Sequence, residues 1–244
     1  MTNTSSLKNK TALITGASRG IGKAIALKLS SEGVRIIACA SSKQNLKQTI
    51  SEIQSKNGTV TSLACDLAQA GQVKRLAQEA LQVYGQIDIL INNAGTSIKK
   101  SFDQSTDEEW KHLFAVNAMA PFILCRECLP SLKNSEAASI IQIGSVVAHK
   151  GYEGQSLYSA SKHALLGFTK ALAEEVKSLN IRVHAINPGG VYTDMVKSMR
   201  PDLDPSGLIK PEEIADIVHF LLTHRNNAML DDIHIRRANG SPWF

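Results

Sequence analysis

The sequence lacks several features that mark common protein classes. It has four cysteines among 244 residues, an aromatic content of 5%, and no cluster of Lys and Arg despite a net charge of +5. No continuous apolar run approaches the roughly 18 residues of a membrane span, and the polar start Met1–Lys10 lacks the apolar core of a signal peptide. These absences argue against a nucleic-acid surface, a membrane protein and a disulfide-stabilised secreted domain.

The four cysteines are best explained as buried thiols. Cys39 and Cys65 lie in apolar, strand-like runs. Cys125 and Cys128 form one C-x-x-C within a helical stretch, and no second Cys/His pair is present at a spacing that would complete a zinc site. A redox role for this pair stays open, although a structural role is favoured. Together these features predict a reducing, cytoplasmic environment.

Apolar strand-like runs alternate with helical patterns along the whole chain. Strands are expected at 10–15, 34–40, 59–66, 87–92, 139–145, 181–187 and 233–236, and helices near 20–30, 44–56, 70–84, 106–132, 157–179 and 211–222. The first six strands look apolar on both faces, as in a parallel sheet covered by helices on both sides. The expected fold is α/β, a single doubly wound Rossmann domain over 1–244 with a seven-stranded, mostly parallel sheet.

Three segments are expected to lie outside this regular pattern. Residues 1–9 are predicted to be a flexible tail, and residues 237–244 a C-terminal tail that packs on its own chain or on a neighbouring subunit. Residues 190–210 contain several glycines and prolines between regular elements. Long irregular segments in compact domains often cover ligands, so this segment is predicted to be a substrate lid.

A glycine-rich turn joins the first strand to the first helix. Its three glycines stand in the pattern G-x-x-x-G-x-G, and such turns let a backbone approach a pyrophosphate at a helix N-terminus. A dinucleotide cofactor is therefore predicted to bind here. The loop residues assigned to it are Gly16, Ser18, Arg19, Gly20, Ile21 and Gly22.

The second strand ends without the acid that commonly binds the adenosine ribose. Ser41, Ser42 and Lys43 stand there instead. Hydroxyl and basic groups suit a 2′-phosphate, and Arg19 adds a possible phosphate partner, so NADP(H) is predicted over NAD(H). Asp66, after the third strand, could accept a hydrogen bond from the adenine amino group or cap the following helix.

One stretch, 145–162, places three groups that could perform proton chemistry together. Tyr158 and Lys162 are four residues apart, and a helix would set them on one face. Ser145 follows the apolar run of the fifth strand, at the edge where open parallel sheets bind ligands. These three residues are therefore candidates for the catalysis of a carbonyl reaction.

These motifs together resemble the short-chain dehydrogenases/reductases, and in particular the branch of the 3-oxoacyl-[acyl-carrier-protein] reductases. The resemblance rests on the glycine turn, the run 92–95 (Asn-Asn-Ala-Gly), Asn117, Ser145, Tyr158-x-x-x-Lys162 and Asn187-Pro188-Gly189, all in family order. It covers about 8–222. After the last strand the chain departs from the family's usual run, with Asp231 to Arg237 in its place.

The resemblance implies a role for each matching residue. Tyr158 would protonate the carbonyl oxygen of the substrate, and Ser145 would bind the same oxygen. Lys162 would lower the pKa of Tyr158 and hold the nicotinamide ribose. Asn117 would bend its helix and anchor a water. The substrate contacts implied are Ser145, Gln155, Tyr158 and Tyr192. The further cofactor contacts implied are Ser41, Ser42, Asp66, Leu67, Asn92, Ala94, Gly95, Tyr158, Lys162, Pro188, Gly189, Val191 and Thr193.

The expected activity is NADPH-dependent reduction of a ketone or aldehyde, with a 3-oxoacyl thioester of acyl-carrier protein among the candidates. The same residues also serve NAD(P)-dependent oxidation of an alcohol, and a non-catalytic cofactor sensor or scaffold is the alternative of another class. The resemblance implies a homotetramer or homodimer. The charge distribution, the lack of long apolar runs and the lack of a second Cys/His pair argue against nucleic-acid, membrane and metal partners. His149 is left open as either a substrate contact or a polar residue at the rim.

Overall fold

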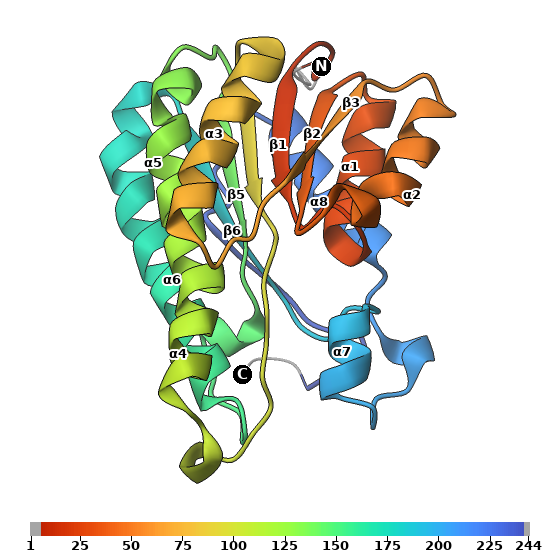
Figure 1. Ribbon diagram of the computed structural model, residues 1–244. Coiled ribbons are helices and arrows are strands. Elements are labelled where there is room, and N and C mark those ends of the chain that lie inside the picture. Colours follow the sequence, from red (N-terminus) through yellow and green to blue (C-terminus); the bar gives the residue numbers. More distant parts are fainter. Residues whose placement is uncertain (1–5, 242–244) are drawn as a thin grey trace.

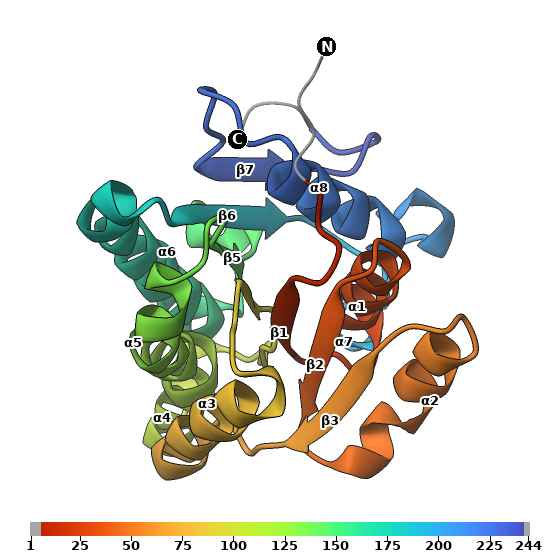
Figure 2. The same ribbon diagram turned by 90° about the horizontal axis from the view of Figure 1, so that it is seen from above.

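The centre of the protein is one sheet of seven strands that are all parallel, in the order β3-β2-β1-β4-β5-β6-β7. The computed structural model describes residues 6–241. The strands are β1 (Thr11–Thr15), β2 (Arg35–Ala40), β3 (Val60–Ala64), β4 (Ile89–Asn92), β5 (Ser139–Ile143), β6 (Arg182–Pro188) and β7 (Asp232–Ile235). The predicted doubly wound fold is confirmed, and Figure 2 shows the strands side by side.

Helices cover both faces of this sheet (Figures 1 and 2). One face carries α1 (Gly20–Ser31), α2 (Lys43–Gln54) and α8 (Pro211–Thr223), and the other carries α3 (Ala70–Tyr84), α5 (Ala120–Lys133) and α6 (Ser156–Val176). Each layer encloses its own apolar core, because alternate side chains of the strands point to opposite faces. The apolar strands therefore bury both faces, as their composition predicts.

The two edge strands differ from the central ones. Every residue of β1, β4 and β5 is buried, whereas β3 has three half-buried residues and an exposed end, and β7 has no buried residue. β3 is less buried because an edge strand has a neighbouring strand on one side only, although α2 and α3 still contact it from opposite faces, as expected. The predicted last strand is present, despite its unusual sequence.

The long helix predicted over 106–132 contains a change of helical pitch. It begins as α4 (Asp107–Phe114), with Thr106 and Glu109 forming the predicted capping box, and continues as α5. Between them, Ala115–Met119 is a π-helical turn. Pro121 lies in the first turn of α5, where its missing N–H costs little. The irregularity thus lies at Asn117, just before the proline.

This composite helix, Asp107–Lys133, has 27 residues, and its most apolar 18-residue window has a mean hydropathy of 1.3, so that by length and composition it could cross a membrane. Polar residues interrupt the stretch, so a search for continuous apolar runs misses it. Half of its most apolar window is buried inside the protein, where α5 contributes to the core beneath the sheet. A core helix passes the same criterion of length and hydropathy.

Two arms extend beyond the carboxyl edge of the sheet (Figure 1). One is α4, and the other holds α7 (Asp194–Met199) with a helical turn at Pro205–Gly207. The segment 190–210 is therefore partly helical rather than irregular throughout.

At the N-terminal end, Leu7 is buried and the Asn9 amide donates to the Gly33 carbonyl at 3.0 Å, so residues 7–9 pack against the fold and are not a flexible tail. Residues 1–5 of the predicted tail lie outside the described residues. Of the predicted C-terminal tail, residues 242–244 lie outside the described residues.

Candidate active site

A cavity of about 920 Å³ opens at the carboxyl edge of the sheet, where residues of α7 and of the loops after the strands line it. This edge is where open parallel sheets bind ligands, because the strand order reverses beside β1. Most of the predicted site residues line the cavity: Gly16, Ser18, Arg19, Gly20, Ile21, Ser41, Asp66, Leu67, Ala94, Gly95, Ser145, Gln155, Tyr158, Lys162, Pro188, Gly189, Val191 and Thr193.

The glycine turn is held by hydrogen bonds between two side chains, Thr15 and Asn93, and the backbone around them. The Thr15 hydroxyl accepts hydrogen bonds from the amides of Asn93 (3.0 Å) and Ala94 (3.1 Å), and the Asn93 side chain donates to the carbonyls of Thr15 (2.8 Å) and Gly16 (3.2 Å). Gly16 has a φ of +66°, and a Cβ there would lie 2.8 Å from Asn93 Nδ2. Only glycine fits this turn without strain.

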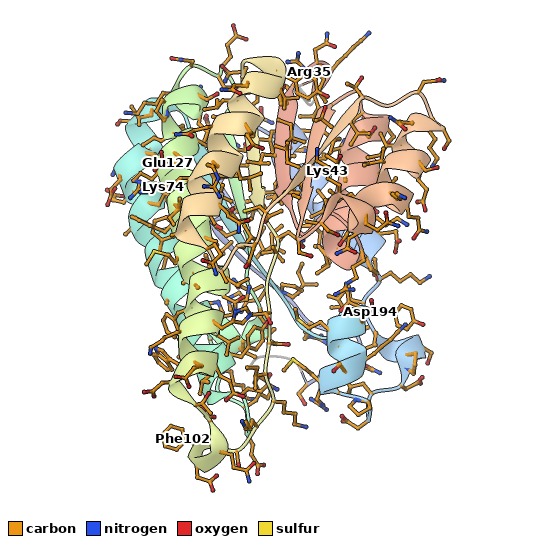
Figure 3. The ribbon with its side chains drawn as sticks, viewed as in Figure 1. Arg35, Lys43, Lys74, Phe102, Glu127 and Asp194 are labelled. Carbon is orange, nitrogen blue, oxygen red and sulfur yellow. The ribbon has the colours of Figure 1, made fainter. Side chains whose placement is uncertain are left out.

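The first helix after the turn leaves its N-terminal amides available. Arg19 is the N-cap of α1 and makes no side-chain cap, and the first turn of α1 has no acid. The N-terminus therefore offers free N–H groups and a positive dipole end to an anion. The exposed Arg19 guanidinium lies 3.6 Å from Asp194 (Nε to Oδ2), at the end of α7 nearest the sheet (Figure 3).

The end of β2 carries hydroxyl groups and no acid. Ser41 lines the cavity and accepts a hydrogen bond from Asn45 Nδ2 at 3.1 Å, while Ser42 is the N-cap of α2. Asp66 also lines the cavity, and its Oδ1 accepts from the Ala68 amide at 3.0 Å. Because the N-cap of α3 is Gln69, the alternative in which Asp66 caps that helix is wrong.

The buried floor of the cavity holds Ser145, Tyr158 and Lys162. Burial raises the pKa of Tyr158, and a hydrogen bond with the Ser145 side chain opposes that rise. Burial lowers the pKa of Lys162 to about 8, and its ammonium donates to the Ile143 carbonyl at 2.9 Å. In this arrangement the Ser145 side chain is the group that lowers the Tyr158 pKa, and the expected effect of Lys162 together with a bound nicotinamide stays a prediction.

Ser145 is fixed by its backbone rather than by its side chain alone. Its amide donates to Asn187 Oδ1 at 3.1 Å, and its hydroxyl accepts from the Val147 amide at 3.3 Å. The neighbouring Gly144 leaves room for Asn187, because a Cβ at Gly144 would lie 1.9 Å from Asn187 Oδ1. The Asn187 side chain thus positions the start of the loop that carries Ser145.

Asn117 is fully buried in the π-helical turn and all its amide hydrogens are used. Its Nδ2 donates to the Thr96 carbonyl (2.8 Å) and the Ser161 hydroxyl (3.0 Å), and its Oδ1 accepts from the Thr96 amide (2.9 Å). A Cβ at Gly95 would lie 3.3 Å from Asn117 Oδ1 and 3.5 Å from Lys162 Nζ. Asn117 therefore lies directly behind the cavity wall, beside Lys162.

Five predicted site residues do not line the cavity. Gly22 and Ser42 support the two cofactor loops from behind, Asn92 is buried and donates to Cys125 Sγ at 3.5 Å, and Asn117 lies behind the wall. Tyr192 is 43% exposed and lines a smaller cavity of about 260 Å³ next to α1. The structure does not bring Tyr192 to the floor that holds Tyr158.

Several residues of the site are not predicted by the sequence patterns. Asn93 lies in the run 92–95, and the pattern alone gives it no role, although its side chain holds the glycine turn in place. Asn187 was likewise only part of a motif. Arg236 and Arg237, after β7, also line the cavity, and no pattern in the sequence pointed to them.

The family model of the short chain dehydrogenases matches residues 10–204. The chain belongs to the short-chain dehydrogenase family. It is 36% identical over 222 residues to the 3-oxoacyl-[acyl-carrier-protein] reductase FabG of Escherichia coli, covering 88% of this chain and 90% of that protein. It is 34% identical over 219 residues to carbonyl reductase family member 4 of Xenopus laevis, covering 88% and 91%. The protein is thus an oxidoreductase of this family.

Solved structures of family members superpose on the whole fold. A metagenomic short-chain oxidoreductase in complex with NADP has a TM-score of 0.85 and 33% identity, covering 96% of this chain and all of that one. A blue fluorescent protein from a metagenomic library, in complex with NADPH, has a TM-score of 0.88 and 28% identity, covering 97% and 100%.

Proposed function

We propose that this protein reduces a ketone or aldehyde to an alcohol with NADPH. The observation that carries the proposal is the buried floor of the cavity, where Ser145, Tyr158 and Lys162 meet directly beyond the glycine turn. The same cavity therefore contains a proton donor, Tyr158, a hydrogen-bonding group for the substrate oxygen, Ser145, and the glycine turn that would bind the cofactor.

The residues present fit a nicotinamide dinucleotide. The tight glycine turn and the uncapped start of α1 suit a pyrophosphate, and Asp66, Leu67, Ala94 and Gly95 provide the lining on the adenosine side. Pro188, Gly189 and Val191 also line the cavity and would contact the nicotinamide, whereas Thr193 lies against the glycine turn, because a Cβ at Gly20 would be 3.0 Å from Thr193 Cγ2. When bound, NADPH supplies the hydride for the carbonyl carbon.

The preference for NADP over NAD rests on the end of β2. Ser41 lies at the cavity surface, no acid stands on the strand end, and Arg19 is 78% exposed across the cavity mouth. A carboxylate at Ser41 would repel a 2′-phosphate, whereas hydroxyl and guanidinium groups bind it. The solved relatives with bound NADP and NADPH support the same preference.

Tyr158 is the proposed general acid. Its raised pKa keeps the phenol protonated in the unliganded protein, so that it can donate a proton to the carbonyl oxygen. The Ser145 hydroxyl lies beside it and would hydrogen-bond the same oxygen as charge develops there. Gln155, one turn before Tyr158 at the start of α6, lines the cavity and would contact the substrate.

Lys162 and Asn117 would complete the site from behind. The Lys162 ammonium is anchored on the Ile143 carbonyl and would hold the nicotinamide ribose with its remaining hydrogens. Because both amide hydrogens of Asn117 are used, a water anchored there for proton resupply would have to donate to an oxygen of that residue.

The substrate class is proposed from the size and charge of the cavity. Its volume of about 920 Å³ holds a cofactor and an extended substrate, and Lys150, Arg200 and Arg237 line its substrate side. A 3-oxoacyl thioester carried on a phosphopantetheine group fits such a basic opening, and FabG of Escherichia coli bears the name of that activity. Residues 190–210, including Tyr192, are proposed to act as the lid over it.

Self-association through the long helices is proposed from their exposed apolar side chains. Trp110, Met119 and Phe122 are each at least 39% exposed on the composite helix α4–α5, and Phe122 packs edge-on against Phe168 of α6 with ring centroids 5.7 Å apart. Exposed apolar side chains of this size suit contact with a second copy of the chain in a dimer or tetramer.

A screen of NADPH oxidation tests the activity. The purified protein is mixed with 3-oxoacyl thioesters, diketones, quinones and sugars, with NADPH and NADH in parallel. We expect turnover with at least one carbonyl compound and a higher kcat/KM with NADPH. The absence of oxidation with every compound would contradict the proposal, and equal kcat/KM for the two cofactors would contradict its cofactor preference.

A further inference from the structure

A cluster of two histidines and an aspartate lies outside the cavity, at the outer edge of the sheet. Asp232 and His234 stand on alternate positions of β7, the edge strand beside β6 (Figure 2), so both point to the same face. His149 comes from the loop after the helical turn Val146–Ala148. It does not line the cavity, and this placement disfavours its expected role as a substrate contact.

The three side chains converge on one carboxylate oxygen. His149 Nε2 lies 3.4 Å and His234 Nε2 lies 3.2 Å from Asp232 Oδ1, and one ligand atom from each residue lies within 4.8 Å of the others. The imidazole rings are 3.9 Å apart between centroids. His149 Nε2 is shielded from solvent and makes no hydrogen bond of good geometry, which is costly for a buried polar atom unless another partner binds there.

These separations match the edges of a tetrahedral metal site. Zinc binds imidazole nitrogen and carboxylate oxygen at about 2.0–2.2 Å, and in a tetrahedron this places neighbouring ligand atoms about 3.3–3.5 Å apart. The two nitrogen–oxygen distances of 3.4 and 3.2 Å lie at or near that range. A late first-row divalent cation prefers such a donor set of imidazoles with a carboxylate.

We propose that His149, Asp232 and His234 form a binding site for a divalent transition-metal cation, with Zn²⁺ as its first candidate. The His234 side chain is 39% exposed, against 20% for His149 and 25% for Asp232, so the site opens toward solvent on the side of β7. A water molecule would supply the fourth ligand there. Bound this way, the cation would join β7 to the loop that follows Ser145.

The surroundings of Asp232 are those of an oriented metal ligand. Asn187 Nδ2 donates to Asp232 Oδ1 at 2.7 Å, which uses one lone pair of that oxygen and leaves the other for the cation. The same Asn187 side chain accepts from the Ser145 amide, so the cluster is connected to the floor of the active site. Lys170 Nζ lies 4.0 Å from Asp232 Oδ2 and occupies the other oxygen, and its charge would weaken binding of the cation.

Equilibrium dialysis of the untagged protein against Zn²⁺, followed by metal analysis, tests the site independently of enzymatic activity. We expect about one Zn²⁺ per chain at micromolar free cation, and a fall in affinity of about 10–100-fold or more in His149→Gln and His234→Gln. His112→Gln is the matched control, because His112 is exposed on α4 and far from the cluster in the sequence. Thermal unfolding establishes that each variant is folded.

Substitution with Co²⁺ provides a second readout, since four-coordinate Co²⁺ with nitrogen and oxygen ligands has strong visible absorption. The spectrum should appear in the wild type and in His112→Gln, and be absent from His149→Gln and His234→Gln. The proposal would be overturned by wild-type protein that binds no stoichiometric Zn²⁺ up to about 100 µM, or by binding that both cluster variants retain. Neither result depends on the reductase activity.

Discussion

The two ends of the cavity are built in different ways. At the glycine-turn end the backbone is packed so closely that a Cβ at Gly22 would lie 2.3 Å from the Gly16 carbonyl oxygen. At the other end, a Cβ at Gly151, in the loop between Val146–Ala148 and α6, would have no described atom within 4 Å, and Arg200 of the second arm pairs with Asp202, two residues away. The first end is fixed by contacts between distant strands, and the second mainly by contacts within its own segments.

This difference separates cofactor binding from substrate choice. A pyrophosphate is bound by backbone amides and needs a rigid turn, so the turn tolerates little change of sequence. We propose that a substrate is selected by side chains such as Met199, Arg200 and Leu203, which line the cavity from a partly helical segment on the surface. Such a segment can vary without loss of the fold.

The largest expected effect comes from a methyl group at the rigid end. Gly22→Ala would place its Cβ against the Gly16 carbonyl and 2.4 Å from Asn93 Nδ2. We expect the free energy of unfolding to fall by about 3 kcal/mol and NADPH affinity to fall by tenfold or more, because the turn must shift. Urea unfolding and fluorescence titration with NADPH measure the two effects. Gly151→Ala is the matched control, and an equal loss in both variants would break the comparison.

The second-largest effect is expected at the buried floor of the cavity, on the pH dependence of the free energy of unfolding. The pKa of Lys162 falls from 10.5 to about 8 in the folded protein because of burial. Between pH 8 and pH 10.5, Lys162 is mostly protonated in the unfolded chain and mostly neutral in the folded protein. The free energy of unfolding should therefore rise with pH across this interval. We expect the wild type to gain about 2–3 kcal/mol over this interval relative to Lys162→Met. Unfolding curves at pH 7.5 and 10.5 measure the gain, and identical pH dependence of both proteins would contradict it.

A carboxylate introduced at the end of β2 tests whether the 2′-phosphate of the cofactor lies beside Ser41, and it leaves the backbone of the glycine turn unchanged. In Ser41→Asp, repulsion of the 2′-phosphate should reduce the ratio of kcat/KM for NADPH to that for NADH by about 30-fold. Ser41→Ala removes the hydroxyl without adding charge and should change the ratio only a few-fold. An unchanged ratio in Ser41→Asp would show that the 2′-phosphate does not lie beside this residue.

The smallest effect is expected at the arm end. Arg200→Ala removes a cavity-lining guanidinium whose ion pair with Asp202 is exposed, so stability should change by less than about 0.5 kcal/mol. We expect KM for an anionic carbonyl substrate to rise about fivefold, while the dissociation constant of NADPH stays the same. A loss of NADPH affinity matching that of Gly22→Ala would show that the two ends are not separate.

The sequence was most informative where local patterns decide the structure. The alternation of strands and helices, the glycine turn and the i,i+4 pair Tyr158–Lys162 all follow from spacing along the chain, and the structure places them as expected. Asn187 and the cluster at Asp232 could not be predicted, because their partners lie more than 40 residues away in sequence. The position of Tyr192 depends on how the arm folds over the sheet, which no periodic pattern encodes.

The most direct test of the proposed chemistry compares the wild type with Tyr158→Phe in two measurements on the same samples. The account predicts that the dissociation constant of NADPH stays within about threefold, because Tyr158 forms the floor and not the pyrophosphate cradle, while turnover of the carbonyl substrate falls by about 10³-fold or more as the proton donor is lost. Turnover in Tyr158→Phe above a tenth of the wild-type rate, with NADPH still bound, would contradict the central claim.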